Sequence, residues 1–320
     1  MKRGAALLDA PDAAACAAED ERLGELLERL DARGYRFVTP NNRTYRILNR
    51  RDGPRLARDL RDMLGWNLPY VSGAIDPQVE TLLASAGQVV RDHCHDRAGL
   101  RVSTVAGQLF LHSGYGAGAD AVFLGPDTYR FVQFLKAELA TISSVKTILD
   151  IGAGAGVGGV LAARFTGARD VTLADINIQA LRLAAINARH ARVRARTVEG
   201  TGLDGTARYD LIVANPPFIA DGGKTATNGG EAGTEVSLDW ARRAMPHLEA
   251  GGRLLLYTGA PIVRGHDALS DALATAAEEA GCRLDYRELD PDIFSETLRQ
   301  PAYAGVERIA AVGAALVRPA

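Results

Sequence analysis

The sequence predicts an α/β protein, in which a doubly wound, seven-stranded and mostly parallel sheet follows a smaller N-terminal α+β domain. Three observations predict this fold. Short apolar segments alternate with helix-like segments from residue 121 onward. A glycine-rich loop joins the first of these apolar segments to a helix. The last two strands lack a full helix between them, which indicates an antiparallel final hairpin.

Each expected strand is an apolar or alternating run bounded by turn residues. The strands are expected over residues 147–151, 171–175, 193–198, 209–214, 253–258, 282–289 and 307–318. Helices are expected over residues 128 to about 140, 176–191, 238–248 and 267–281. A further helix is expected to begin directly after the glycine loop. In such a sheet, ligands lie outside the carboxyl ends of the strands, where the strand order reverses.

The first 120 residues follow a different pattern. Ala13–Arg33 has the periodicity of an amphipathic helix that ends at Gly34, a short strand is expected over Tyr35–Val38, and Leu100–His112 alternates like a hairpin. The small and polar segment Ala117–Asp120 predicts a boundary. We therefore expect an N-terminal substrate-recognition domain over residues 1–120 and a cofactor-binding domain over residues 121–320.

Composition excludes several classes of protein. The net charge of −2 creates no global field that would attract nucleic acid. The three scattered cysteines, Cys16, Cys94 and Cys282, are too few for a disulfide framework and favour a reducing, cytoplasmic location. No run approaches the roughly 18 apolar residues of a membrane helix, and Asp9 and Asp12 interrupt any signal-peptide core.

Residues 41–62 are rich in arginine and allow two interpretations. They could form a basic surface for nucleic acid through Arg43, Arg46, Arg50, Arg51, Arg55 and Arg58. They could instead form a solvated helix face with internal ion pairs, such as Arg55 with Asp59. The interleaved aspartates, and the lack of an aromatic cluster among the arginines, favour the second interpretation.

The sequence His93-Cys94-His95 raises the question of a metal site. A zinc site needs four ligands at set spacings, and no second pair of ligands stands nearby. We therefore expect no metal.

The central motif begins with Thr147–Ile151, which leads directly into a loop containing Gly152, Gly154 and Gly156. Glycine permits sharp turns and close approach of a ligand, and the helix that follows offers free N–H groups at its start. Gly154, Gly156 and Gly159 also satisfy the dinucleotide pattern G-x-G-x-x-G. The loop alone therefore does not distinguish a dinucleotide from another adenosine cofactor.

Asp175 stands at the carboxyl end of the second expected strand. At this position a carboxylate can accept hydrogen bonds from both hydroxyls of a ribose. The alternative is that Asp175 caps the next helix, since Asp is a preferred N-cap residue.

The third motif, Asn215-Pro216-Pro217-Phe218, follows the fourth expected strand. Two prolines remove backbone donors and fix the chain in an extended form. The Asn215 side chain and the carbonyls of Asn215 and Pro216 can then accept hydrogen bonds from an NH₂ group, while Phe218 packs on the planar group that carries it. A rigid loop without a ligand is the alternative, and a nicotinamide enzyme has no use for this motif.

With these motifs, residues 123–318 resemble class I S-adenosylmethionine-dependent methyltransferases of the Asn-Pro-Pro-Tyr/Phe group, which have a Rossmann-like fold. Release-factor glutamine methyltransferases and guanine-N2 ribosomal RNA methyltransferases are the most similar members. The resemblance implies that S-adenosyl-L-methionine is the cofactor and that Asn215, Pro216, Pro217 and Phe218 hold the target nitrogen. It places cofactor contacts at Asp150, Gly152, Ala153, Gly154, Gly156, Asp175, Ile176 and Asn215.

Two further segments are compared with this family. Pro126, Asp127 and Thr128 match a Pro-Arg-Pro-acid-Thr segment that covers the cofactor, although Gly125 replaces the arginine and Tyr129 the acid. Asp127 could alternatively cap the helix that follows. After the third strand, where the family places Ser-Asp or Gly-Asp near the adenine, the assigned cofactor contacts are Gly200 and Thr201.

The resemblance implies an N-methyltransferase that acts on a planar amino or amide nitrogen, with a protein glutamine favoured as the acceptor. An RNA or DNA base and a small amine remain as alternative acceptors, and a non-catalytic cofactor-binding module is the alternative from another class. The glycine-rich segment Ala220–Gly233 is expected to close over the substrate.

Overall fold

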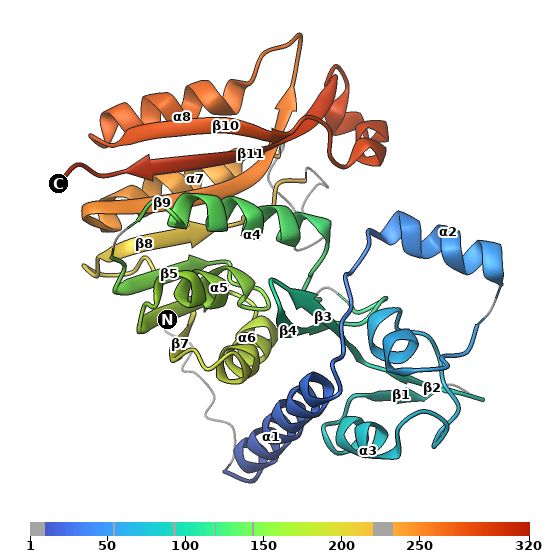
Figure 1. Ribbon diagram of the computed structural model, residues 1–320. Helices are drawn as coiled ribbons and strands as arrows, with labels where there is room; N and C mark the ends of the chain where they lie inside the picture. Colours follow the sequence, from blue (N-terminus) through green and yellow to red (C-terminus); the bar gives the residue numbers. More distant parts are fainter. Residues whose placement is uncertain (1–9, 54, 92–93, 119, 143, 220–232) are drawn as a thin grey trace, which may run out of the picture. The chain divides into compact units, whose positions relative to one another are not determined.

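The structure is a computed structural model that describes residues 10–53, 55–91, 94–118, 120–142, 144–219 and 233–320. The chain divides into two compact units between Ala117 and Gly118 (Figure 1). Each unit has its own elements. The boundary expected from the sequence lay three residues further on, after residue 120.

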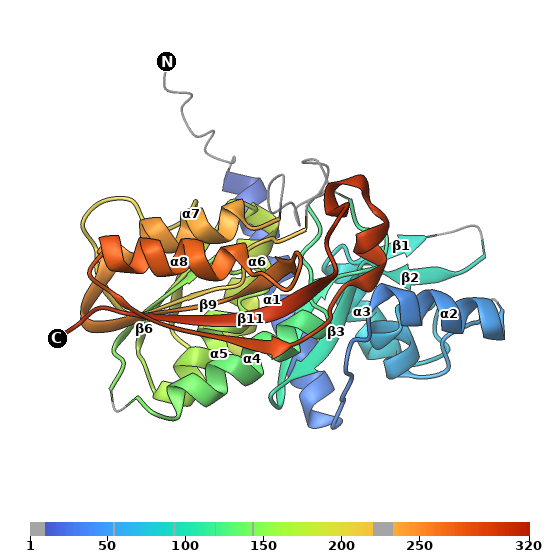
Figure 2. The ribbon, with the colours of Figure 1, turned by 90° about the horizontal axis from the view of Figure 1, so that it is seen from above.

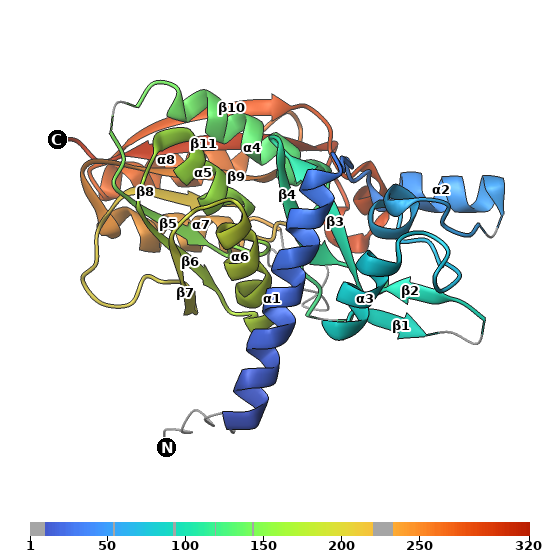
Figure 3. The ribbon, with the colours of Figure 1, turned by 60° about the horizontal axis from the view of Figure 1, so that its bottom comes forward.

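The first unit is a mixture of helices and short antiparallel strands. Its elements are α1 (Ala10–Ala32), α2 (Asn42–Asp52), the π-helical turn η1 (Arg61–Gly65), α3 (Pro77–Ser85), β1 (Val89–Arg91), β2 (Asp96–Ala98), β3 (Leu100–Val105) and β4 (Gln108–Ser113). Helices α1 and α3 lie side by side (Figure 3). The amphipathic helix is confirmed, since Leu23, Leu26, Leu27 and Leu30 are all buried, and the β3–β4 pairing confirms the hairpin.

The short strand expected over Tyr35–Val38 is wrong, because residues 35–40 form no strand. Phe37 does lie beside β3, where its carbonyl accepts from the Thr104 N–H at 2.7 Å. Its own N–H, however, donates to the Thr104 side-chain hydroxyl at 3.2 Å. A side-chain hydroxyl therefore takes the place of a backbone acceptor, and a regular ladder does not form.

The arginine-rich region also differs from the expectation. Helix α2 ends at Gly53, whose φ of 70° breaks the helix, so Arg55 and Asp59 do not lie on a helix and the expected i,i+4 pair is wrong. An ion pair between described residues of this region joins Arg58 to Asp62, with Nε and Oδ2 at 3.1 Å.

An aromatic cluster does accompany these arginines, which the sequence interpretation missed. The Tyr45 ring of α2 stacks on the Tyr115 ring with centroids 3.7 Å apart and lies 6.5 Å from the Trp66 ring. The guanidinium of Arg101 lies over the Tyr115 ring, 4.0 Å from its centroid. The cluster is assembled from segments far apart in the sequence, so local composition could not reveal it.

The second unit is a three-layer α/β/α domain. Its main elements are α4 (Pro126–Leu139), β5 (Thr147–Ile151), α5 (Val157–Thr166), β6 (Asp170–Asp175), α6 (Ile178–His190), β7 (Ala195–Glu199), β8 (Tyr209–Ala214), α7 (Glu235–Ala244), β9 (Leu248–Ile262), α8 (Ala268–Glu279), β10 (Arg283–Asp290) and β11 (Arg308–Val317). The 3₁₀ turns η2 (Met245–His247), η3 (Ser295–Arg299) and η4 (Pro301–Tyr303) complete it.

The seven strands follow the order β10-β11-β9-β8-β5-β6-β7. Strand β11 runs antiparallel to both of its neighbours, whereas β9, β8, β5, β6 and β7 are parallel. The prediction of a doubly wound, mostly parallel sheet with an antiparallel final hairpin is confirmed. Helices α4 and α5 cover one face of the sheet, and α7 and α8 cover the other (Figure 2).

The chain order reverses between β5 and β8. From β5 the chain builds β6 and β7 on one side, and β8 then returns to pair with the other edge of β5. The carboxyl ends of β5 and β8 are therefore the switch point at which open α/β sheets bind ligands. Apolar side chains of both strands, including Leu149, Ile151 and Ile212, are fully buried and make this edge rigid.

Two expectations concern residues outside the described ranges. One is the question of a metal site, which involves His93, and the other is the closing segment, of which residues 220–232 are not described. Within the described residues, no group of three or more His, Cys, Asp or Glu side chains is arranged to hold a metal ion. In the same part of the chain, no helix combines the length and apolar character needed to cross a membrane.

Candidate functional site

The strand register brings the three sequence motifs into one row. Ile151 at the end of β5 pairs with Ala214 of β8 on one side and with Ala174 of β6 on the other. Asp175 in turn pairs with Glu199 of β7. The next residue along each strand is Asn215, Gly152, Asp175 or Gly200. These four residues therefore lie along one edge of the sheet, with neighbouring strands about 4.8 Å apart.

The glycine loop has a conformation that favours glycine at three positions. Gly152, Gly154 and Gly156 have φ values of 65°, 53° and 78°, in the left-handed region that side chains disfavour. A Cβ on Gly152 would lie 2.4 Å from Cη2 of Trp240, whereas a Cβ on Gly154 would meet nothing within 4 Å. The loop is therefore closely packed at its start and open to a ligand at Gly154.

Asp175 fixes the shape of this loop. Its Oδ2 accepts from the Gly154 N–H at 2.8 Å, and its Oδ1 accepts from the Asn177 N–H at 2.9 Å. The cap of α6 is Asn177, whose Oδ1 accepts from the Gln179 N–H at 2.9 Å. The alternative that Asp175 caps this helix is therefore wrong. A carboxylate has about four lone-pair directions, so the half-buried Asp175 keeps capacity for two further donors.

Asp150 is the buried carboxyl of the site. It is 2% exposed, and its Oδ2 accepts from the Gly159 N–H at 2.7 Å, which ties β5 to the first turn of α5. The pKa of Asp150 is raised to about 7, mainly by burial; the hydrogen bond from the Gly159 N–H opposes the rise, and the negative charge of Asp175 adds to it. The site thus contains a carboxyl that titrates near neutral pH.

This pKa makes stability depend on pH. Asp150 has an ordinary pKa near 3.8 when unfolded and about 7 when folded, so its proton stabilises the fold at low pH and is lost as the pH rises through 7. Between pH 5 and pH 8 the wild-type free energy of unfolding should fall by about 3 kcal/mol relative to that of Asp150→Asn. Urea unfolding of both proteins at the two pH values measures this difference. Parallel pH profiles for the two proteins would contradict it.

Asn215 contains a buried acceptor. Its Oδ1 is buried and has no hydrogen-bond partner within the described part of the chain. An unsatisfied buried acceptor costs about 1–3 kcal/mol, and a donor on a ligand would supply the missing partner. Asn215 follows β8 directly and stands beside Gly152 in the strand row.

The rest of the motif is packed into the second unit. Pro216 and Phe218 are buried, and Pro217 is half-buried. The Phe218 ring meets the Phe294 ring edge to face with centroids 5.6 Å apart. A Cβ on Gly259 would lie 2.5 Å from Cδ2 of Phe218, so the ring rests closely against β9.

Pro126 and Thr128 lie at the start of α4. Gly125 is the N-cap position, and its N–H donates to Oγ1 of Thr128 at 3.3 Å. Asp127 is not the cap: it is buried, and its Oδ1 accepts from the Tyr257 hydroxyl at 3.0 Å. Because Tyr257 follows Leu256, which pairs with Ala214, this contact places the start of α4 at the same sheet edge as Asn215.

The residues assigned to the adenine side lie beside Asp175. The Gly200 N–H donates to the Asp175 carbonyl at 2.9 Å, and the Thr201 hydroxyl accepts from Nη2 of Arg243 at 3.2 Å. Ile176 is 80% exposed, so a large apolar side chain stands uncovered next to the acid. Oδ2 of Asp204 lies 3.9 Å from where a Cβ on Gly200 would be.

Several site residues were missed by the sequence interpretation. Trp240 contacts the glycine loop, Tyr257 holds Asp127, and Phe294 and Gly259 hold Phe218. Only one signal could have found any of them: a glycine inside a strand, such as Gly259, often marks a close approach. The others reach the site through strand register, which single-sequence patterns do not specify.

Comparison with known proteins finds similarities within the second unit. Residues 128–280 match the family described as methyltransferase small domain. The chain is 34% identical to ribosomal RNA small subunit methyltransferase C of Serratia proteamaculans over 119 residues. This alignment covers 35% of the chain and 30% of that protein.

Two other relatives match the same region. The chain is 33% identical to release factor glutamine methyltransferase of Bordetella pertussis, over 36% of the chain and 44% of that protein. It is 31% identical to methyltransferase HEMK2 of Mus musculus, over 40% of the chain and 66% of that protein. The matches thus span from under a third to about two thirds of these relatives.

Proposed function

We propose that the chain is an S-adenosyl-L-methionine-dependent N-methyltransferase that acts on a planar amino or amide nitrogen, and the match of residues 128–280 to the methyltransferase small domain family supports this. The observation that carries this proposal is the buried Oδ1 of Asn215, which has no partner among the described residues. It stands beside Gly152 at the switch point of the sheet, where a donor on a substrate would satisfy it.

The residues at the sheet edge fit this cofactor. The open space before Gly154 admits the amino-acid part, the remaining lone pairs of Asp175 suit ribose hydroxyls, and the exposed Ile176 suits the flat adenine. Further proposed contacts come from Asp150, Ala153, Gly156, Gly200, Thr201, Pro126 and Thr128. When bound, the cofactor supplies a methyl group already activated by its sulfonium, so the protein needs neither a nucleophile nor a metal.

The protein's task is to prepare the acceptor nitrogen. The lone pair of an amide or exocyclic amine is delocalised into its planar group and is therefore a poor nucleophile. Hydrogen bonds from the N–H groups to Oδ1 of Asn215 and to the Pro216 carbonyl would orient this nitrogen and favour its pyramidal form. The rate enhancement would then come from orientation and fixed dipoles.

Binding titrations with two ligands test the identity of the cofactor. Calorimetry should detect S-adenosyl-L-methionine binding to the full chain, and a fluorescence titration should detect no NADH binding. Binding of NADH in preference to S-adenosyl-L-methionine would reject the proposal and restore a nicotinamide oxidoreductase.

A protein glutamine is the first candidate for the acceptor. The chain has a net charge of −2, which mildly favours a protein or small acceptor over a polyanion. The name of one relative, release factor glutamine methyltransferase, points to the same chemistry. We place the reaction in the cytoplasm, because three free cysteines suit a reducing compartment.

An RNA base is the second candidate, and helix α2 of the first unit favours it. Arg43, Arg46, Ile47 and Arg50 follow the i, i+3, i+4, i+7 spacing and form one exposed face of this helix. The face carries three arginines over about 10 Å and no acid. Tyr45, which anchors the helix on Tyr115, lies on its opposite side.

This face should bind nucleic acid through phosphate contacts. Arg43→Ala/Arg50→Ala should weaken binding of a short RNA and reduce the slope of log K against log salt by about 1.5. The matched control is Arg22→Ala/Arg36→Ala, which removes two exposed arginine charges from the same unit. Equal RNA affinity and equal salt slopes for both double variants would reject RNA as the partner of this face and leave the protein acceptor.

A further inference from the structure

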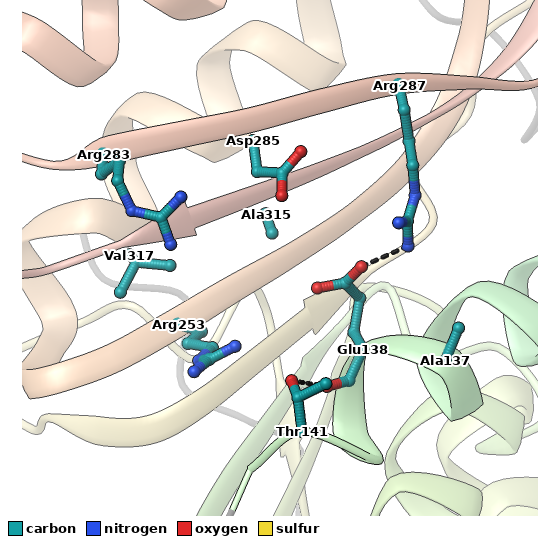
Figure 4. Close-up of a pocket in the computed structure, with 9 residues that line it drawn as sticks. All are labelled: Ala137, Glu138, Thr141, Arg253, Arg283, Asp285, Arg287, Ala315 and Val317. Atoms are coloured by element: carbon teal, nitrogen blue, oxygen red, sulfur yellow. Dashed lines mark hydrogen bonds and ion pairs between the residues drawn. The ribbon is translucent and has the colours of Figure 1, made fainter.

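A hollow in the second unit lies away from the carboxyl ends of the parallel strands, over the amino-terminal part of β9. It has a volume of about 420 Å³ and lies between the C-terminal end of α4 and strands β9, β10 and β11 (Figure 4). Its floor is made by Ala315 and Val317, and three arginines and two acids stand around it. None of these residues belongs to the row at the carboxyl ends of the strands.

The strand register explains why the hollow exists. On this face of β11, Gly313 and Ala315 are small, and α4 reaches the sheet at Gly313, where a Cβ would lie 2.6 Å from Cε2 of Phe134. Helix α4 ends at Leu139. Beyond its end the short Ala315 side chain leaves a space between the helix terminus and β10.

The same register brings two arginines together. Val317 pairs with Arg283 on one side and with Arg253 on the other. Their side chains therefore share one face of the sheet, with Cα atoms about 10 Å apart across β11. Figure 4 shows both guanidinium groups directed over the hollow.

The charges of these arginines are not balanced. Arg287 is held by an ion pair with Glu138 and lies over the Phe134 ring. Across the described ranges, neither Arg253 nor Arg283 has an acidic group within 4.0 Å. Three arginines against Glu138 and Asp285 leave the hollow with a net charge of +1, which attracts an anion.

We propose that this hollow binds a phosphate group, held between the guanidiniums of Arg253 and Arg283. The planar fork of a guanidinium matches the geometry of phosphate oxygens and can donate two parallel hydrogen bonds. A volume of about 420 Å³ also leaves room for the group that carries the phosphate. The phosphate could belong to a small molecule or to an RNA backbone.

Asp285 determines where in the hollow the phosphate lies. It stands between Arg283 and Arg287 on β10 and faces the same side of the sheet. Its carboxylate repels an anion, so the proposed phosphate position is at the Val317 end of the hollow, which Arg253 and Arg283 flank. Replacing Asp285 with asparagine should therefore strengthen phosphate binding, in contrast to the effect of removing an arginine.

Calorimetric titration of the full chain with inorganic phosphate, at constant ionic strength, tests the proposal. Arg253→Ala/Arg283→Ala should weaken phosphate binding by at least about tenfold, and Asp285→Asn should strengthen it several-fold. The matched control is Arg169→Ala/Arg194→Ala, which removes two exposed arginines from the loops before β6 and β7 and should bind as the wild type does.

Two further arms complete the experiment. Competition with adenosine monophosphate and with a short RNA identifies the source of the phosphate. Binding of S-adenosyl-L-methionine to Arg253→Ala/Arg283→Ala should be unchanged, which verifies the fold and separates this site from the proposed methyl-transfer site. The proposal is overturned if the wild type binds no phosphate at millimolar concentrations, or if the two double variants weaken binding equally.

Discussion

Replacing Asn215 with alanine should lower turnover by about thirtyfold to a thousandfold, a loss of about 2–4 kcal/mol of transition-state stabilisation, while cofactor affinity stays within a few-fold of the wild type. The reason is that Oδ1 of Asn215 is a fixed, buried acceptor without a partner among the described residues. In the proposed function this acceptor contacts the target nitrogen, so the loss should appear in kcat more than in the affinity for S-adenosyl-L-methionine.

A conservative variant distinguishes this role from a structural one. Asn215→Asp retains an oxygen acceptor at the same position and should keep more turnover than Asn215→Ala. Thermal unfolding should show that Asn215→Ala folds, because removing an unsatisfied acceptor does not remove an internal hydrogen bond; the same measurement checks that Asn215→Asp folds. If Asn215→Ala turns over as fast as the wild type, the proposed role of this residue is wrong.

Replacing Asp175 with alanine should weaken binding of S-adenosyl-L-methionine by about tenfold to a hundredfold, as expected for the loss of charge-assisted hydrogen bonds. Two effects act in the same direction. The variant loses the acceptor proposed for the ribose hydroxyls, and it releases the Gly154 N–H, which now donates to Oδ2 at 2.8 Å. The glycine loop would therefore become less well ordered before the cofactor binds.

Calorimetry on three variants separates these effects. Asp175→Asn keeps one oxygen acceptor and removes the charge, so it should bind more tightly than Asp175→Ala. Asp170→Ala removes an exposed carboxylate at the start of the same strand and should bind as the wild type does. No loss of cofactor affinity in Asp175→Ala would refute the role of this carboxylate.

The sequence was sufficient to predict the row of motifs at the sheet edge. Each of Gly152, Asp175 and Asn215 follows an apolar strand directly, and parallel strands bring their carboxyl ends to one edge. That physical rule does not depend on details of packing. The paired registers of β5, β6 and β8 confirm that these residues are neighbours.

The errors of the sequence interpretation concern contacts between distant segments or competition among nearby residues. Asn177 rather than Asp175 caps α6, because the Asp175 carboxylate is occupied by the glycine loop. Tyr45 stacks on Tyr115, seventy residues further on, which no local pattern indicates. Asp127 likewise accepts a hydrogen bond from Tyr257, a residue distant in the sequence, which no local pattern indicates.

The most direct test of methyl transfer to a planar nitrogen uses S-adenosyl-L-methionine with a labelled methyl group and an extract of cells that express the chain. Matched samples are treated with protease or with RNase, and the labelled product is digested and identified by mass spectrometry. The proposal predicts label on an amide or exocyclic nitrogen, lost to protease for a glutamine acceptor and to RNase for an RNA acceptor, and nearly absent with Asn215→Ala. Bound cofactor with no label in any fraction, or label only on oxygen, sulfur or carbon, would contradict it.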